Sequence, residues 1–199
     1  TSDAVLDQVL SLLQQDRIIA FPTDSFYALG VMPMSHRAVE RLLACKGRSD
    51  GKPILVLVAG ADQVSTFAAE VPLVAARLMA AFWPGPLTIV GPAKADLPNA
   101  LTAGTGTIGL RQPHHPAVLR LLRHVGPLTG TSANRSSRPP AQHAEDVLQD
   151  FGEELGVLLD GGNAPGGQSS TVVDTVGGVK LIREGPVSWD AIQRVLACA

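Results

Sequence analysis

The feature that most constrains the fold of this chain is the alternation of short apolar runs with amphipathic helical stripes. Strand-sized runs rich in β-branched residues occur at 17–21, 54–58, 87–90, 107–111, 128–130 and 157–160. Helical patterns lie between most of them, at 4–13, 35–44, 61–68, 72–81, 116–124 and 141–151. Ser2 or Asp3 can cap the first of these helices, Ser35 the second, and Ser188 a last helix. Two further runs, 171–176 and 179–183, turn at Gly177-Gly178 and predict a hairpin. Since the hairpin requires antiparallel pairing and the alternation favours parallel pairing, we expect one α/β domain over residues 1–199, built around a mixed sheet.

Prolines predict where several of these elements end. Pro22 lacks the amide donor that a sheet needs, so the first strand should stop there and residues 23–30 should form a loop at a strand end. The stretch 82–86, which reads Phe-Trp-Pro-Gly-Pro, excludes both a helix and a central strand. We expect a rigid corner at this position.

Composition excludes several classes of protein. The 199 residues are 45% hydrophobic, but no apolar run approaches the ~20 residues that span a bilayer. The net charge of −2, with one Tyr, two Trp and five Phe, disfavours a primary nucleic-acid binder. Cys45 and Cys198 are far apart and lack CxxC spacing, which argues against a structural zinc site. The first residues carry no secretory signal, so a cytoplasmic location is expected.

The most basic short segment is 46–53, where Lys46, Arg48 and Lys52 stand among turn-forming residues. A loop could bring these three cations together on one polyphosphate. The alternative is an ordinary solvated loop whose charges have no specific ligand.

Three motif-like patterns do not meet the structural context that their functions need. The GxGxxG pattern at 104–109 has no clear strand before it and no helix after it, so a Rossmann site is not expected. Lys52 is followed by proline, where a Walker loop requires Ser or Thr. Ser132 lacks the second glycine of a GxSxG nucleophile motif, and the five histidines show no metal-binding spacing. The 130–134 loop instead offers neutral donors for phosphate or ribose oxygens.

Several unusual segments, in one order, carry a family resemblance. They are 21–30, 46–48 with 52–53, 83–88, 109–114, 131–134 and 170–174. Together these segments resemble the YrdC-like family of threonylcarbamoyl-AMP synthases. The resemblance spans nearly the whole chain.

The resemblance implies a YrdC-like twisted mixed sheet flanked by helices around a large concave cavity. It implies that L-threonine, bicarbonate or CO2, and ATP with Mg²⁺ give threonylcarbamoyl-AMP and pyrophosphate, the first step of tRNA t6A modification. No tightly bound protein metal site is implied. Partners would be a threonylcarbamoyl transferase that accepts the product and, transiently, tRNA, with no membrane. Because the chain stops at Ala199, we expect a short form without the extra C-terminal domain of longer members.

The resemblance also assigns roles to individual residues. It places the triphosphate and the catalytic charge stabilisation on Lys46 and Arg48, with Lys52 beside them. It places the threonine on Thr23, Tyr27, Arg111 and Ser170, with Arg111 as a bidentate clamp for the carboxylate. It places the nucleotide on Thr107, Ser132, Asn134 and Arg183 as well. Purely structural roles are the alternative: a turn for Thr23 and Tyr27, a cap for Ser132 and Asn134, and a pair with Glu184 or a helix end for Arg183.

The chain departs from the family pattern at Ser25, Phe26 and Ala28, which puts the fit for threonine over serine in question. Ser49 and Ser137 are further departures, and neither removes a charge. Two other functions share this scaffold: a non-catalytic module that binds tRNA or double-stranded RNA, and a carbamoyl-transfer domain of the hydrogenase-maturation kind. RNA binding alone would fall steeply with salt and would need no ATP.

Overall fold

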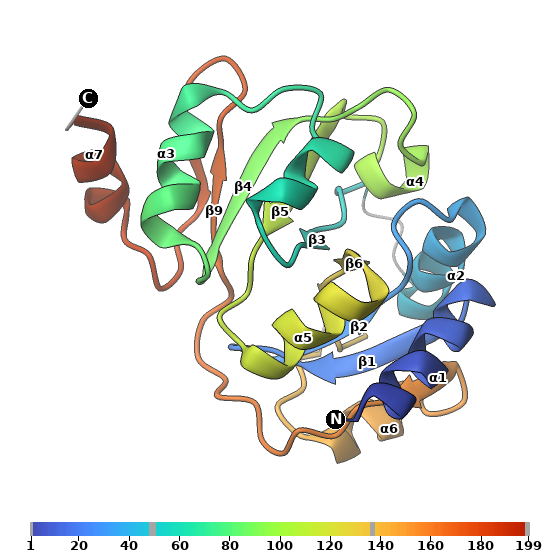
Figure 1. Cartoon of the computed structure of the whole chain (residues 1–199). Coiled ribbons are helices and arrows are strands. Elements are labelled where there is room, and N and C mark those ends of the chain that lie inside the picture. Colours follow the sequence, from blue (N-terminus) through green and yellow to red (C-terminus); the bar gives the residue numbers. More distant parts are fainter. Residues whose placement is uncertain (1, 48–50, 136–137, 198–199) are drawn as a thin grey trace.

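The computed structural model describes residues 2–47, 51–135 and 138–197, and its strands form two sheets (Figure 1). The four-stranded sheet has the order β7-β2-β1-β8, with β1 (Ile18–Pro22), β2 (Tyr27–Gly30), β7 (Thr131–Ser132) and β8 (Leu155–Leu158). The six-stranded sheet has the order β10-β9-β4-β5-β3-β6, with β3 (Val56–Leu57), β4 (Leu87–Pro92), β5 (Thr107–Arg111), β6 (Leu128–Thr129), β9 (Thr171–Asp174) and β10 (Lys180–Arg183). Both sheets contain parallel and antiparallel pairs, as the sequence predicted.

Helices cover the two sheets. They are α1 (Asp3–Gln14), α2 (His36–Lys46), the 3₁₀ helix η1 (Ala61–Thr66), α3 (Leu73–Phe82), α4 (Asn99–Thr102), α5 (Pro116–Val125), α6 (Ala144–Phe151) and α7 (Trp189–Ala197). The caps predicted at Ser35 and Ser188 are confirmed, since their hydroxyls each accept the amide of a residue three positions on, at 3.2 Å. Ser2 precedes α1 but makes no side-chain cap bond. No helix in the described ranges combines the length and the apolar character needed to cross a membrane.

The loop predicted at 23–30 is wrong in its second half. β2 runs antiparallel to β1, with Pro22 opposite Tyr27, so only residues 23–26 form the connection. The amide and the hydroxyl of Thr23 both donate to the carbonyl of Phe26, at 3.1 and 2.7 Å, and close this turn. Pro22 is tolerated because it is the last residue of its strand.

The strands form two sheets and not the single mixed sheet expected from the sequence. The chain passes from one sheet to the other at Gly130. β6 pairs with β3 of one sheet, and β7, one residue later, pairs with β2 of the other. A Cβ atom at Gly130 would lie 2.5 Å from Cγ of the buried Leu57, so a larger residue at this crossing point would force the Leu57 side chain to move.

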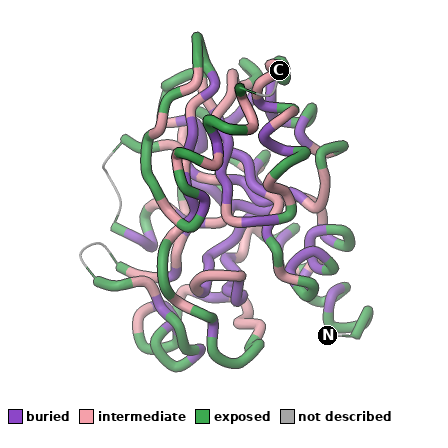
Figure 2. The backbone as a smooth tube through the Cα atoms, turned by 90° about the vertical axis from the view of Figure 1, so that its left-hand side faces the viewer, coloured by how far each residue is buried: buried purple, intermediate pink, exposed green. Residues whose placement is uncertain are grey.

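Two hydrophobic cores lie on the two faces of β1. Ile18 and Ala20 belong to the larger core, which continues under the six-stranded sheet to α3 and α7. Ile19 and Phe21 belong to a smaller core closed by α1 and α5. Every residue of β1 is therefore buried, and the buried segments form a continuous centre in Figure 2.

Candidate active site

A cavity of about 670 Å³ lies between the two sheets. Three neighbouring strands, β9, β4 and β5, form the floor of the cavity, and the alternation of side chains along each strand determines which residues face it. In β4 and β5, Leu87, Ile89, Ile108 and Leu110 face the core. The residues between and beside them line the cavity instead, and β9 adds more: Thr88, Val90, Thr107, Gly109, Arg111, Val172 and Asp174.

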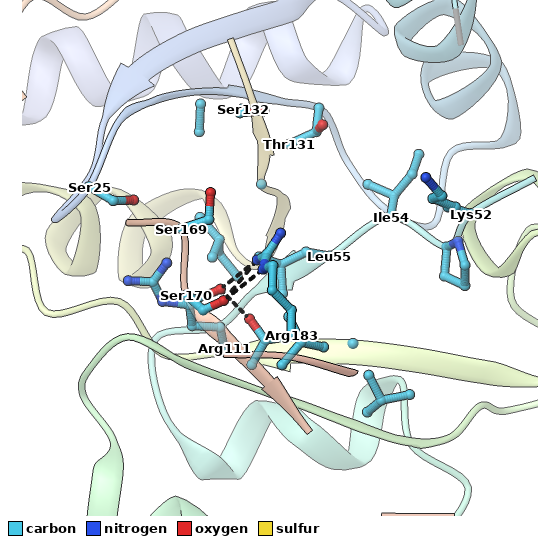
Figure 3. A pocket seen from close by; sticks show the side chains of 18 of the residues that line it. Ser25, Lys52, Ile54, Leu55, Arg111, Thr131, Ser132, Ser169, Ser170 and Arg183 are labelled. Atoms are coloured by element: carbon cyan, nitrogen blue, oxygen red, sulfur yellow. Dashed lines mark hydrogen bonds between the residues drawn. The ribbon is translucent and has the colours of Figure 1, made fainter. Parts of the chain in front are cut away.

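The opposite wall comes from the four-stranded sheet and its loops. It consists of Thr23, Ser25, Phe26, Tyr27, Ala28, Thr131, Ser132 and Asn134. In Figure 3, Ser25, Thr131 and Ser132 face Arg111, Ser170 and Arg183 across the cavity, and Lys52 lies toward one end. Segments from both halves of the chain thus enclose one space.

The predicted site residues come together here. Every one of them that the structure describes lines the cavity: Thr23, Tyr27, Lys46, Lys52, Thr107, Arg111, Ser132, Asn134, Ser170 and Arg183. Arg48 lies outside the described residues. The individual roles of these residues stay predictions.

Lys46 does not lie on the loop that the sequence predicted, because it is the last residue of α2. Gly47 ends the helix in a left-handed conformation (φ 59°). The Lys46 side chain is buried, and its Nζ donates to the carbonyls of Ser132 at 2.5 Å and Asn134 at 2.9 Å. This ammonium therefore holds the 131–134 loop as well as lining the cavity.

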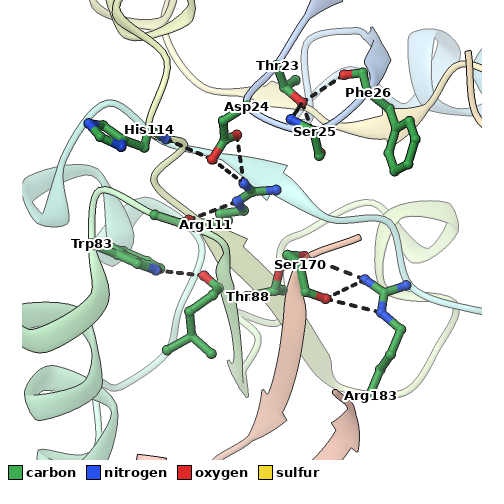
Figure 4. A network of polar contacts seen from close by, with 12 residues as sticks. Thr23, Asp24, Ser25, Phe26, Trp83, Thr88, Arg111, His114, Ser170 and Arg183 are labelled. Carbon is green, nitrogen blue, oxygen red and sulfur yellow. Dashed lines mark hydrogen bonds and ion pairs between the residues drawn. The ribbon is translucent and has the colours of Figure 1, made fainter. Parts of the chain in front are cut away.

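Arg111 pairs with Asp24, which comes from the 23–26 turn of the other sheet (Figure 4). Its Nη2 donates to both Asp24 oxygens, at 2.7 and 2.6 Å, and its Nε donates to the carbonyl of Gly85 at 3.0 Å. The Arg111 side chain is only 5% exposed. Burial lowers the pKa of this guanidinium, and the neighbouring Asp24 carboxylate opposes that shift. A bidentate clamp on a ligand, as predicted, would require Asp24 to release Nη2.

The predicted corner at 82–86 supports Arg111 from below. The indole Nε1 of Trp83 donates to the carbonyl of Leu87 at 2.7 Å. The amide of Gly85 donates to the carbonyl of Gln112 at 2.8 Å, which leaves the Gly85 carbonyl facing Nε of Arg111. Three polar contacts therefore tie this turn to β4 and β5.

Arg183 is held by the segment before β9. Its Nε and Nη2 donate to the carbonyl of Ser170, at 3.1 and 2.8 Å, so the alternative pair with Glu184 does not form. The Ser170 hydroxyl lies 2.8 Å from the hydroxyl of Thr88, and both side chains are buried. Burial lowers the pKa of Arg183. Its charge also contributes to lowering the pKa of Arg111, as expected for two cations that share one cavity.

The remaining predicted residues use their polar atoms within the protein. The Ser132 hydroxyl donates to Oδ1 of Asn134 at 2.6 Å, and Nδ2 of Asn134 donates to the carbonyl of Arg138 at 2.7 Å. The Tyr27 hydroxyl donates to the carbonyl of Gly162 at 2.7 Å. The bonds of Ser132 and Asn134 match the structural alternative raised above, whereas Tyr27 lies in β2 and not in a turn. All three side chains still line the cavity.

Asp24 and Thr88 stand in the motifs but received no role from the sequence. Asp24 is 87 residues from Arg111 and Thr88 is 82 residues from Ser170, so no local spacing connects the partners. The GxGxxG segment at 104–109 is a turn that leads into β5, and no helix follows it, as predicted. Among the described residues, no group of three or more His, Cys, Asp or Glu side chains could hold a metal ion, and Asp174 is the only acidic residue on the cavity wall.

Comparison with known proteins identifies the family. Residues 11–185 match the Sua5/YciO/YrdC family, which carries the description "Telomere recombination". The chain belongs to this family. The threonylcarbamoyl-AMP synthase of Bacillus subtilis is 35% identical over 199 residues, covering 98% of this chain and 58% of that protein. The Pyrococcus abyssi synthase is 34% identical over 186 residues, with 92% and 55% covered. The chain therefore spans somewhat more than half the length of these relatives.

Solved structures of the Sua5/YciO/YrdC family agree with the fold. P. abyssi Sua5 in complex with L-threonine has a TM-score of 0.92 and 32% identity, covering 98% of this chain and 58% of that one. Escherichia coli YciO has a TM-score of 0.83 and 26% identity, covering 93% and 91%. The resemblance and the α/β fold expected from the sequence are both confirmed.

Proposed function

We propose that this chain is an L-threonylcarbamoyladenylate synthase, a nucleotidyltransferase that makes threonylcarbamoyl-AMP from L-threonine, bicarbonate or CO2, and ATP. The observation that carries the proposal is the convergence of Lys46, Lys52, Arg111 and Arg183 on one cavity from separate elements. Two relatives with 34–35% identity carry the same activity in their names, and one solved relative binds L-threonine.

The chemistry joins two anions, which explains why a cationic cavity suits it. The threonine amine adds to CO2 and loses a proton, which gives a carbamate. A carbamate oxygen then bonds to the α-phosphorus of ATP, and the bond from that phosphorus to pyrophosphate breaks. Because a carboxylated amino acid must approach a triphosphate, fixed positive charges stabilise the transition state without a covalent protein intermediate.

We assign the residues that line the cavity to the two substrates as the sequence predicted. Arg111, Thr23, Tyr27 and Ser170 would bind the amino acid. The triphosphate would lie against Lys46 and Lys52, with Arg48 on the same segment, and the rest of the nucleotide would contact Thr107, Ser132, Asn134 and Arg183. Mg²⁺ would arrive on the ATP phosphates, since Asp174 alone among the described wall residues offers a carboxylate.

The product is a mixed anhydride of a carbamate and a phosphate, which water destroys readily. A threonylcarbamoyl transferase that acts in tRNA t6A modification is therefore the expected acceptor, in the cytoplasm. Transient contact with tRNA belongs to that later step.

Pyrophosphate release tests this proposal. The protein is incubated with ATP, Mg²⁺ and bicarbonate, with and without L-threonine, and release should require threonine. Arg48→Ala and Arg111→Ala should each lower the rate at least tenfold, which corresponds to about 1.4 kcal/mol of lost transition-state stabilisation. Arg37→Ala is the matched control, because the Arg37 side chain is 77% exposed and does not line the cavity. Threonine-independent release, or unchanged rates in both site variants, would contradict the assignment.

A further inference from the structure

Asp24 has no role in the function proposed above, yet it makes the shortest polar contacts of Arg111, the most buried cation of the site. Its carboxylate binds Arg111 and so connects the 23–26 turn of the four-stranded sheet to β5 of the six-stranded sheet. Oδ2 also accepts the backbone amide of His114 at 3.2 Å (Figure 4). The carboxylate is thus held from two positions on the far side, and only 14% of the Asp24 side chain is exposed.

These contacts determine which part of Arg111 can reach a ligand. Gly85 occupies Nε and the Asp24 carboxylate occupies Nη2, whereas Nη1 has no partner in the described part of the chain. Arg111 lines the cavity and Asp24 does not. The guanidinium therefore has one side turned to the protein and its Nη1 left for a ligand.

We propose that Asp24 is a positioning residue that orients Arg111, so that Nη1 is presented to the carboxylate of the amino-acid substrate. The inference rests on the proposed function, because it takes an amino acid as the ligand. The sequence predicted a clamp in which two nitrogens of Arg111 bind the substrate carboxylate. In this proposal only Nη1 binds it, while Nη2 stays bonded to Asp24.

Charge balance supports this role. Arg111 is buried beside Arg183, and a buried guanidinium without a counter-ion is costly. Without the Asp24 charge, only the Gly85 carbonyl would direct Arg111, and the guanidinium could turn away from the amino-acid region. Amino-acid binding should then weaken, while ATP binding to the Lys46 and Lys52 region should change little.

The opposite role makes a distinct prediction. If Asp24 occupied the place of the substrate carboxylate, threonine would have to displace it, and removing its charge would strengthen threonine binding. The position of Asp24 away from the cavity wall and its bond to the His114 amide argue against such competition.

The test compares wild type with Asp24→Asn, Asp24→Ser and Asp24→Glu. The measurements are the KM for L-threonine, the KM for ATP, and the Kd of L-threonine by calorimetry, which needs no turnover. We expect the Asn and Ser variants to raise the threonine KM and Kd at least fivefold and to change the ATP KM less than twofold. Glu, which restores the carboxylate, should recover part of the threonine affinity. Asp3→Asn is the control, since it breaks the exposed Asp3–Arg120 pair on the helical surface.

Several outcomes would overturn the inference. They are unchanged or tighter threonine binding in the Asn and Ser variants, an equal loss of threonine and ATP affinity, failure of both variants to fold, and absence of L-threonine binding by the wild type. If wild type binds threonine but releases no threonine-dependent pyrophosphate, the proposed function fails. The Kd comparison then still decides the role of Asp24.

Discussion

The buried hydroxyl pair between Thr88 and Ser170 joins β4 to the segment that leads into β9, on the wall of the cavity. The two oxygens lie 2.8 Å apart, and each residue is 4% exposed. Ser170→Ala leaves the Thr88 hydroxyl buried without this partner, whereas Thr88→Val, which keeps the shape, leaves the Ser170 hydroxyl only its 3.5 Å contact with Nη2 of Arg183. An unsatisfied buried hydroxyl costs about 1–3 kcal/mol, so each single variant should lose about that much unfolding free energy.

The double variant should lose clearly less than the sum of the two single losses, because neither hydroxyl is then left alone. We expect a coupling free energy of about 1 kcal/mol. Urea denaturation of the four proteins measures it, and in thermal unfolding 1 kcal/mol corresponds to about 2–4 °C in a chain of this size. Losses that add within about 0.3 kcal/mol would refute the argument that the two hydroxyls bond to each other. The threonine KM should also rise more in Ser170→Ala than in Thr88→Val if Ser170 contacts the amino acid.

Two further predictions concern packing and pH. Gly130→Ala should destabilise the protein by about 1–3 kcal/mol in urea, because the new methyl group would overlap the buried Leu57 side chain. Gly91→Ala, where a Cβ meets nothing within 4 Å, should stay within about 0.5 kcal/mol, and equal losses would contradict this reasoning. Burial raises the pKa of the Cys45 thiol from 9.0 to about 11. The folded state therefore keeps a proton that the unfolded state releases, so stability is fully present below pH 9 and falls by at most about 3 kcal/mol as the pH rises to about 11. Denaturant titrations at several pH values should show a smaller fall in Cys45→Ala, and an equal slope in both proteins would disprove the assignment.

Local patterns in the sequence were sufficient for much of the fold. Most strands and helices, the caps at Ser35 and Ser188, and the hairpin at Gly177-Gly178 follow from residues within a few positions of each other, whereas β2 and α4 were not predicted. Periodicity, hydroxyl caps and left-handed glycines act over such short distances, so no tertiary information is needed. The family motifs likewise indicated which residues would line one cavity.

Tertiary structure alone decided how those residues are paired. The division into two sheets at Gly130 depends on strand partners far away in the chain, and it creates the space that the motifs surround. Arg111 meets Asp24 across 87 residues, and Lys46 meets the carbonyl of Ser132 across 86. A charged residue in a sequence shows its chemistry but not its counter-ion, because burial and neighbouring charge exist only after the chain has closed on itself. For this reason the sequence could name Arg111 as a site residue, whereas only the folded chain determines which of its nitrogens remains for a ligand.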